Sequence, residues 1–149
     1  MSKKINFQFL ISYFGLIPYV LTFLDKYYFL VVEEEDLLNF VTYYSLIIIV
    51  FIGSINWNLK NNPPTHIVIY GFLPSLFAVI IIILSLLNIN FIIIFILIIL
   101  LLLTQLFFDY IILFANESNK QAFNYLRLPL TVLIIIFDNT LFAIISDNF

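Results

Sequence analysis

The sequence predicts an all-α integral membrane protein with five transmembrane helices, and three observations lead to this fold class. Hydrophobic residues make up 64% of the 149 residues and charged residues 10%, whereas soluble domains have roughly 45–50% apolar and about 25% charged residues. The mean hydropathy is +1.15. Above all, Phe91 to Phe114 is almost unbroken Ile, Leu and Phe, and a helix of this length covers the ~30 Å hydrocarbon layer of a bilayer.

We expect one membrane domain, residues 1–149, with the first predicted span at about residues 5–24. Pro18 falls inside this span and is tolerated there, because neighbouring helices can satisfy the carbonyl group that a proline leaves without a donor. Lys3 and Lys4 followed by an apolar run resemble a signal peptide. No small-residue cleavage site follows the run, so we expect the segment to be retained as a span.

The second predicted span covers about residues 37–57 and follows a loop, residues 25–36, that ends in four consecutive acidic residues. Trp57 lies where a headgroup anchor is expected. Small and polar residues recur along one face of this helix, and we interpret that face as a packing surface. Its members are Thr42, Ser45, Gly53 and Asn56.

The third and fourth predicted spans, about residues 67–87 and 91–114, are joined by a tight turn at residues 88–90, which predicts an antiparallel hairpin. Thr65 is expected to cap the third span, and Pro74 is expected to bend it. A stripe of small residues, which lets helices approach closely in lipid, follows one face of this span: Gly71, Ser75, Ala78 and Ser85.

Ionisable and polar residues interrupt the fourth span and the fifth, about residues 125–145. A charged side chain in hydrocarbon is costly and must face a partner. From their depths along the two helices we expect Asp109 to pair with Arg127, and Gln105 to pair with Asp138. These pairs act either as a clamp between two helices or as a proton or substrate relay. We favour the clamp, because no chain of ionisable groups is evident.

The distribution of lysine and arginine predicts the orientation. With five spans the two termini lie on opposite sides, and cytoplasmic loops carry an excess of these residues. One side holds only Lys26, together with the acidic loop and Asp147. The other side, which we predict to be cytoplasmic together with the N-terminus, holds Lys3, Lys4, Lys60, Lys120 and Arg127.

Most classes of enzyme and ligand site have no residues to support them. The chain contains no Cys, which excludes disulfides and thiolate chemistry. The one histidine, His66, is expected at the interface. The acidic residues 33–36 are expected to form a solvated loop, or to bind a divalent cation loosely, since they lack EF-hand spacing. A paired nucleophile and base, a phosphate-binding glycine loop and a basic patch are all missing. We therefore expect no enzymatic activity, no cofactor, no metal and no nucleic-acid partner.

Several short motifs occur in an order that covers nearly the whole chain: residues 15–18 (GLIP), 51–57 (FIGSINW), 70–75 (YGFLPS), 105–109 (QLFFD) and 125–131 (YLRLPLT). With these motifs the chain resembles the transmembrane protein 69 family, small membrane proteins of bacteria and mitochondria grouped under a domain of unknown function. The chain departs from the family pattern at Asn56, where a His or Arg is common, and at Asn58, where a Gly is common. The resemblance implies a helical membrane protein with no established activity. The matching positions include Trp57, Pro74, Asp109 and Arg127.

Two functional hypotheses remain from the sequence, both for a multi-pass protein of a bacterial inner membrane. The first is a non-enzymatic structural, interaction or assembly factor that packs against other membrane proteins or against copies of itself. The second is a small transporter or ion-conducting subunit, which would use the polar residues near mid-membrane: Gln105, Asp138 and Asn139.

Overall fold

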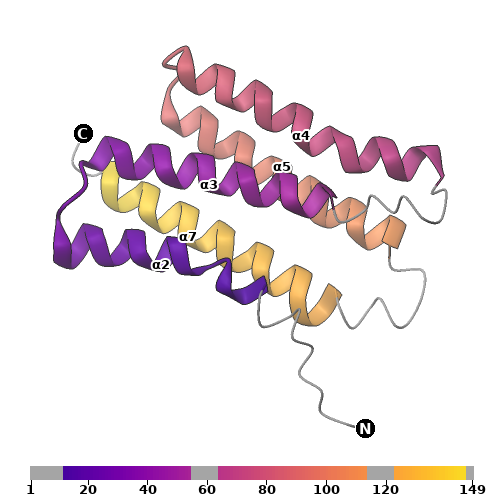
Figure 1. The fold of residues 1–149 in the computed structure, drawn as a ribbon, viewed down its shortest axis with the longest axis horizontal. Helices are drawn as coiled ribbons and strands as arrows, with labels where there is room; N and C mark the ends of the chain where they lie inside the picture. The colour runs from indigo at the N-terminus through magenta and orange to yellow at the C-terminus, as the bar shows by residue number, and fades with distance from the viewer. Residues whose placement is uncertain (1–11, 55–63, 114–122, 147–149) are drawn as a thin grey trace, which may run out of the picture. The chain divides into compact units, whose positions relative to one another are not determined.

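The computed structural model describes residues 12–54, 64–113 and 123–146, and the regular structure in these ranges is helical (Figure 1). Four stretches are long and apolar enough to cross a membrane: Glu34–Ser54, Thr65–Leu86, Phe91–Ile111 and Phe123–Ile144. They correspond to the second to fifth predicted spans, so the all-helical class is confirmed. The elements in chain order are α2 (Ile17–Leu24), the π-helix η1 (Asp25–Phe29), α3 (Glu34–Ser54), α4 (Thr65–Leu86), α5 (Phe91–Leu113), the π-helix η2 (Phe123–Arg127) and α7 (Leu128–Ser146).

The first predicted span lies partly outside the described residues, and its described part is not one continuous helix. The backbone N–H groups of Gly15 and Leu16 donate to carbonyls three residues earlier, as in a turn. Pro18 then occupies the first turn of α2. A proline in a helix interior has no N–H to donate and clashes with the preceding turn, whereas the first turn needs no such donor. Pro18 therefore starts a helix here and does not lie inside a longer one.

The chain forms two compact units, a first unit of residues 1–41 with 117–149 and a second unit of residues 42–116. In the first unit, α2 and α7 lie side by side and run in the same direction (Figure 1). Ring contacts join the two helices, and a hydrogen bond joins the residues that precede them. The Tyr13 hydroxyl donates to the Tyr125 carbonyl at 2.7 Å. Further along, the ring of Phe137 lies 5.7 Å from that of Tyr19 and 5.5 Å from that of Phe23.

Proline again explains the hydrogen bond between Tyr13 and Tyr125. Pro129 follows Tyr125 by one helical turn and has no N–H to donate to the Tyr125 carbonyl. A carbonyl left in this way must find another donor when no water is available. The Tyr13 hydroxyl supplies that donor, so a proline in the first turn of α7 leaves free the carbonyl that joins η2 to the residues just before α2.

The link from α2 to α3 is shorter than the predicted acidic loop. Leu30 ends η1 in the left-handed conformation, the Asp25 carboxylate accepts from the Val32 N–H at 3.1 Å, and Lys26 forms an ion pair with Glu34. Helix α3 begins at Glu34, so Glu34, Glu35 and Asp36 form its first turn. The prediction that the loop extends to residue 36 is wrong, because the partial positive charge at a helix N-terminus favours acidic residues in that turn.

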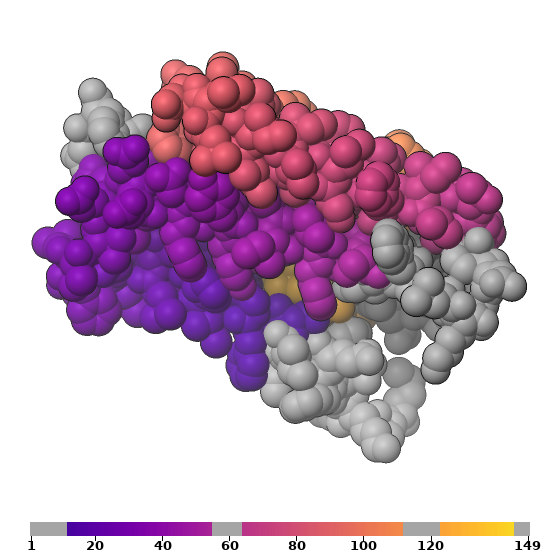
Figure 2. Space-filling model, turned by 45° about the horizontal axis from the view of Figure 1, so that its top comes forward, coloured from indigo at the N-terminus to yellow at the C-terminus, as the bar shows by residue number. Residues whose placement is uncertain are grey.

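The second unit contains the predicted hairpin, in which α4 and α5 lie antiparallel side by side (Figure 1). Asn88 takes the left-handed conformation with φ 57°, which asparagine tolerates better than most residues. The side chain of Asn90 caps α5 by accepting from the Ile92 N–H at 2.8 Å. The hairpin prediction is therefore confirmed. In the space-filling view, α4 and the start of α5 form one continuous surface (Figure 2). Large apolar residues of these two helices are exposed, among them Ile69, Phe72, Val79, Ile83, Ile92 and Ile96.

The start of α4 differs from the prediction in one detail. Thr65 is the first residue of α4, and Pro64 occupies the cap position without a side-chain cap. The Pro64 carbonyl accepts from the N–H groups of Ile67 at 2.9 Å and Val68 at 3.3 Å. The prediction of a Thr65 cap is wrong, because Thr65 already lies within the helix and the Pro64 carbonyl accepts the first hydrogen bonds of α4.

Helices α3 and α4 come close together at a glycine, Gly53. A Cβ atom added to Gly53 would lie 2.8 Å from Pro74 Cγ and 3.0 Å from the Gly71 carbonyl oxygen. Both neighbours belong to rigid groups, a proline ring and a backbone. Gly71 and Pro74 are themselves buried. The predicted small-residue faces of these two helices therefore meet at Gly53.

We expect Gly53→Ala to destabilise the second unit by about 1–3 kcal/mol, because the added methyl group overpacks a contact with rigid walls. Thermal unfolding of the purified protein in detergent measures the effect as a lower Tm. Ser54→Ala is the matched control, since Ser54 is exposed and its hydroxyl donates to Phe51 of its own helix. An unchanged Tm for Gly53→Ala would mean that α3 and α4 do not meet at this glycine.

Candidate functional site

The polar centre of the second unit is built from one residue of α4 and two residues of α5. The Tyr70 hydroxyl lies 2.7 Å from Asp109 Oδ1 and 3.0 Å from the Gln105 carbonyl oxygen. Gln105 and Asp109 are four residues apart, so they share a face of α5. Tyr70 is 7%, Gln105 2% and Asp109 3% exposed. These buried hydrogen bonds join α4 to α5 within the hairpin.

Gln105 also connects α5 to α3. Its side-chain Nε2 donates to the Ile49 carbonyl at 2.9 Å. A carbonyl oxygen accepts only, so the amide nitrogen must be the atom that faces Ile49. The amide oxygen Oε1 is buried and has no hydrogen-bond partner in the described part of the chain. The Gln105 amide nitrogen therefore joins two helices, whereas its amide oxygen has no hydrogen-bond donor in the described residues.

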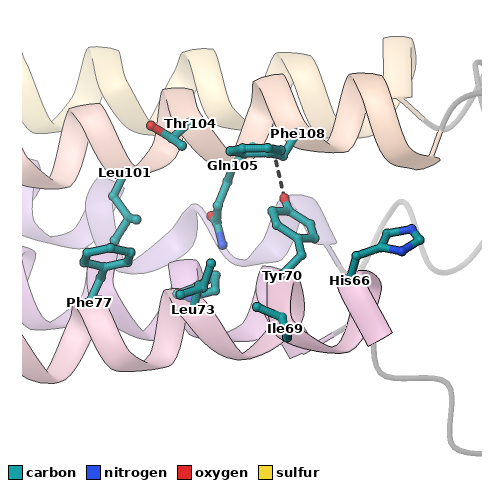
Figure 3. Close-up of a pocket in the computed structure, with 10 residues that line it drawn as sticks. His66, Ile69, Tyr70, Leu73, Phe77, Leu101, Thr104, Gln105 and Phe108 are labelled. Carbon is teal, nitrogen blue, oxygen red and sulfur yellow. Dashed lines mark hydrogen bonds between the residues drawn. The ribbon is translucent and has the colours of Figure 1, made fainter. Parts of the chain in front are cut away.

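A pocket of about 350 Å³ opens beside this centre, between α4 and α5. Figure 3 shows that Tyr70 reaches from α4 toward α5, that Gln105 extends from α5 between the helices, and that Phe77 and Leu101 face each other farther along. His66 lies at the end of the pocket nearest the start of α4. The lining is mainly apolar and consists of His66, Ile69, Tyr70, Leu73, Pro74, Phe77, Leu101, Thr104, Gln105 and Phe108.

The hydroxyl groups of the pocket lining are already engaged. The Tyr70 hydroxyl contacts Asp109 and the Gln105 carbonyl. The Thr104 hydroxyl donates to the Leu100 carbonyl of its own helix at 2.6 Å, a common arrangement for threonine in a helix. Neither hydroxyl is a donor to Gln105 Oε1. Apart from His66 at its rim, the pocket therefore has a mainly apolar lining, in which Gln105 carries one buried acceptor without a partner in the described residues.

The remaining predicted site residues lie in the first unit or outside the described residues. Asp138 is fully buried in α7, and Arg127 ends η2. The expected pairs Asp109 with Arg127 and Gln105 with Asp138 would join the two units, so they stay predictions. Asn139 is exposed, and its amide donates to Ile135 of its own helix at 2.8 Å. Asn56 and Trp57 lie outside the described residues.

Tyr70 is the site residue that the sequence reasoning missed. Depth matching, which suggested Arg127 as the partner of Asp109, also points to Tyr70. Tyr70 lies ~8 Å from the start of α4, and Asp109 lies ~6 Å from the end of α5. Because a tight turn makes these helices antiparallel, the two residues lie at one level along the hairpin. The same matching applied to every neighbouring helix would have found the contact.

The pocket offers no set of metal ligands. In the ranges that the structure describes, no group of three His, Cys, Asp or Glu residues could hold a metal ion. His66 is exposed at the pocket rim, and its place at the membrane interface stays a prediction. The arrangement around Tyr70, Gln105 and Asp109 can do two things chemically. It can hold helices together, and it can accept one hydrogen bond from a molecule in the pocket.

One family model matches residues 6–141, and its description is "Protein of unknown function (DUF3429)". The match covers most of the chain, including the described helices up to Leu141. Searches of curated proteins and of solved structures found no significant match.

We expect Tyr70→Phe to lower the free energy of unfolding by about 0.6–1.7 kcal/mol, the range of hydrogen bonds between helices in membrane proteins. Thermal unfolding of Tyr70→Phe, Asp109→Asn and the double variant forms a double-mutant cycle that isolates their coupling. Tyr28→Phe is the matched control, because Tyr28 is 77% exposed. Additive effects of Tyr70→Phe and Asp109→Asn would show that the two side chains do not interact.

Proposed function

The chain belongs to the family of proteins of unknown function DUF3429, and on that premise we propose that it is a non-enzymatic structural, interaction or assembly factor. It acts within the bacterial inner membrane by packing against other membrane proteins or against copies of itself. Its four described helices of spanning length are compatible with a membrane protein. We also propose that its narrower relatives are the transmembrane protein 69-like proteins that its short motifs resemble.

The observation that carries this proposal is how the second unit uses its buried polar groups. Tyr70, Gln105 and Asp109 make hydrogen bonds between helices, and the pocket beside them is lined mainly by apolar side chains. A transporter of ions or polar solutes needs a polar route with water access. Bonds that fix helices, next to an apolar pocket, favour a packing role over transport.

We further propose the predicted topology of five spans with a cytoplasmic N-terminus. The lysine and arginine distribution supports the cytoplasmic N-terminus, and the parallel contacts of α2 and the residues before it with η2 and α7 support the five spans. Tyr13 contacts Tyr125 near the start of the Phe123–Ile144 span, and Phe23 contacts Phe137 farther along it. If α7 crosses the membrane, residues 13–23 lie at membrane depth and cross in the same direction. Parallel neighbours are what a first and a fifth span require.

A small transporter or ion-conducting subunit is the second candidate, and Asp138 favours it. This carboxyl group is fully buried within a stretch of spanning length. Ionisable groups at such positions often mark proton or ion pathways. Asp138→Asn in a proton-flux assay with sealed vesicles distinguishes the candidates, since a packing factor gives no flux in either form.

Cysteine accessibility tests the topology, because the chain has no native Cys. In spheroplasts, we expect a membrane-impermeant maleimide to label Glu33→Cys and Asn148→Cys, but to label Ser2→Cys only after lysis. Glu33 is exposed in the link between α2 and α3. Labelling of Ser2→Cys and Glu33→Cys from the same side would contradict a first span.

Site-specific photo-crosslinking in native membranes tests the packing role. We expect a photoreactive residue at Ile96 or Phe107, which are 52% and 61% exposed on α5, to give a reproducible adduct with a membrane protein or a second copy. The same residue at Ile98, which is fully buried, is the control and should give none. If the two exposed positions yield only lipid adducts, the proposed packing role is wrong.

A further inference from the structure

We propose that the pocket between α4 and α5 binds a membrane-soluble apolar alcohol, a molecule with a hydrocarbon body and one hydroxyl group that donates to Gln105 Oε1. This goes beyond the packing role, because a ligand site of this kind does not follow from helix association. The proposal combines two observations: a pocket of about 350 Å³, and a buried acceptor atom without a partner in the described residues on Gln105, which is one of the residues that line it. The volume lies within the range of ligand pockets, which are mostly apolar with a few fixed polar groups.

The geometry of Gln105 defines what the ligand must supply. Because Nε2 donates to the Ile49 carbonyl, rotating the amide by 180° would place two oxygens against each other. Oε1 is therefore held in place as an acceptor. A buried acceptor without a donor is unfavourable, and the hydroxyl groups of Tyr70 and Thr104 are engaged elsewhere. The missing group is one hydrogen-bond donor.

The depth of Gln105 decides which molecule can bring that donor. Gln105 lies ~12 Å from one end of α5 and ~21 Å from the other, which is well inside the ~30 Å hydrocarbon layer. Water is scarce there, and the donors of a phospholipid remain at its headgroup. A molecule that dissolves in hydrocarbon and carries its own hydroxyl reaches this level. The apolar lining residues, such as Leu73, Phe77 and Leu101, suit its hydrocarbon body.

The pocket favours a small molecule over a helix of another protein. It is a concave space closed on two sides by α4 and α5, and its lining is confined to residues 66–77 and 101–108. A helix needs a long groove with anchor positions at i, i+3, i+4 and i+7. A single acceptor at the inner wall suits one hydroxyl group on a compact or chain-like ligand.

Photoaffinity labelling tests the proposal with two matched probes, a long-chain alcohol that carries a diazirine and its methyl ether. The full-length protein is placed in phosphatidylcholine nanodiscs, whose lipid has no free hydroxyl donor. We expect the alcohol to label peptides within residues 66–77 and 101–108 about tenfold more efficiently than the ether, the ratio that one hydrogen bond gives. Equal labelling by the two probes would overturn the proposal.

Two variants assign the labelling to the pocket. Leu101→Trp fills the pocket and should abolish labelling by the alcohol, whereas Leu100→Trp is the matched control and should not, because Leu100 is 54% exposed and does not line the pocket. Gln105→Met removes the acceptor and should make alcohol and ether equal. If Gln105→Met fails to fold, the Leu101→Trp comparison still decides. Unchanged labelling of Leu101→Trp would place the ligand elsewhere.

Labelling in native membranes separates a small ligand from a protein occupant. We expect the alcohol to label the pocket peptides there as well, and an excess of unmodified alcohol to compete. Pocket peptides that are instead cross-linked to another membrane protein, and that the alcohol cannot reach, would assign the pocket to a partner helix and overturn the proposal.

Discussion

The constraint that explains most of this structure is the lack of water at membrane depth. A polar group in hydrocarbon has no solvent partner, so it must form its hydrogen bonds within the protein. The chain meets this constraint with bonds between helices. Tyr70 contacts Asp109, and Gln105 contacts Ile49, in the second unit, while the Tyr13 hydroxyl serves the Tyr125 carbonyl in the first. Each bond also fixes which helices are neighbours, and in a lipid solvent, where apolar burial gives little preference, such bonds carry much of the specificity.

Proline has a double role in this arrangement. Pro18 determines where α2 begins, and Pro64 occupies the cap position of α4. Pro129 leaves a carbonyl for another helix to satisfy, and Pro74 supplies the rigid wall against which Gly53 fits. The same residue type therefore limits single helices and creates contacts between them. These effects depend on the missing N–H and the fixed ring, and not on hydrophobicity.

Run length and turn chemistry made much of the fold predictable. Long apolar runs gave the four helices of spanning length, and Asn88 to Asn90 gave the hairpin. The acidic start of α3 was missed because hydropathy separates charged from apolar residues but ignores the dipole at a helix N-terminus. In the candidate site, Gln105 and Asp109 were found because polar residues stand out in an apolar run. Tyr70 was missed because the depth matching compared the fourth span only with the fifth, and because a tyrosine hydroxyl, which can also face the headgroups, stands out less in an apolar run than Gln or Asp.

The two units differ in how their sequence is arranged, and this affects the order in which the protein is made. Residues 42–116 form the second unit as one continuous stretch, whereas the first unit combines residues 1–41 with residues 117–149. During synthesis, Tyr13, Tyr19 and Phe23 emerge long before their partners Tyr125 and Phe137. Tyr19 and its ring partner Phe137 are more than a hundred residues apart in the sequence. The ribosome must therefore synthesise all of these residues before α2 can contact α7. Until then α2 lacks its contacts with α7, while the hairpin of α4 and α5 can already close.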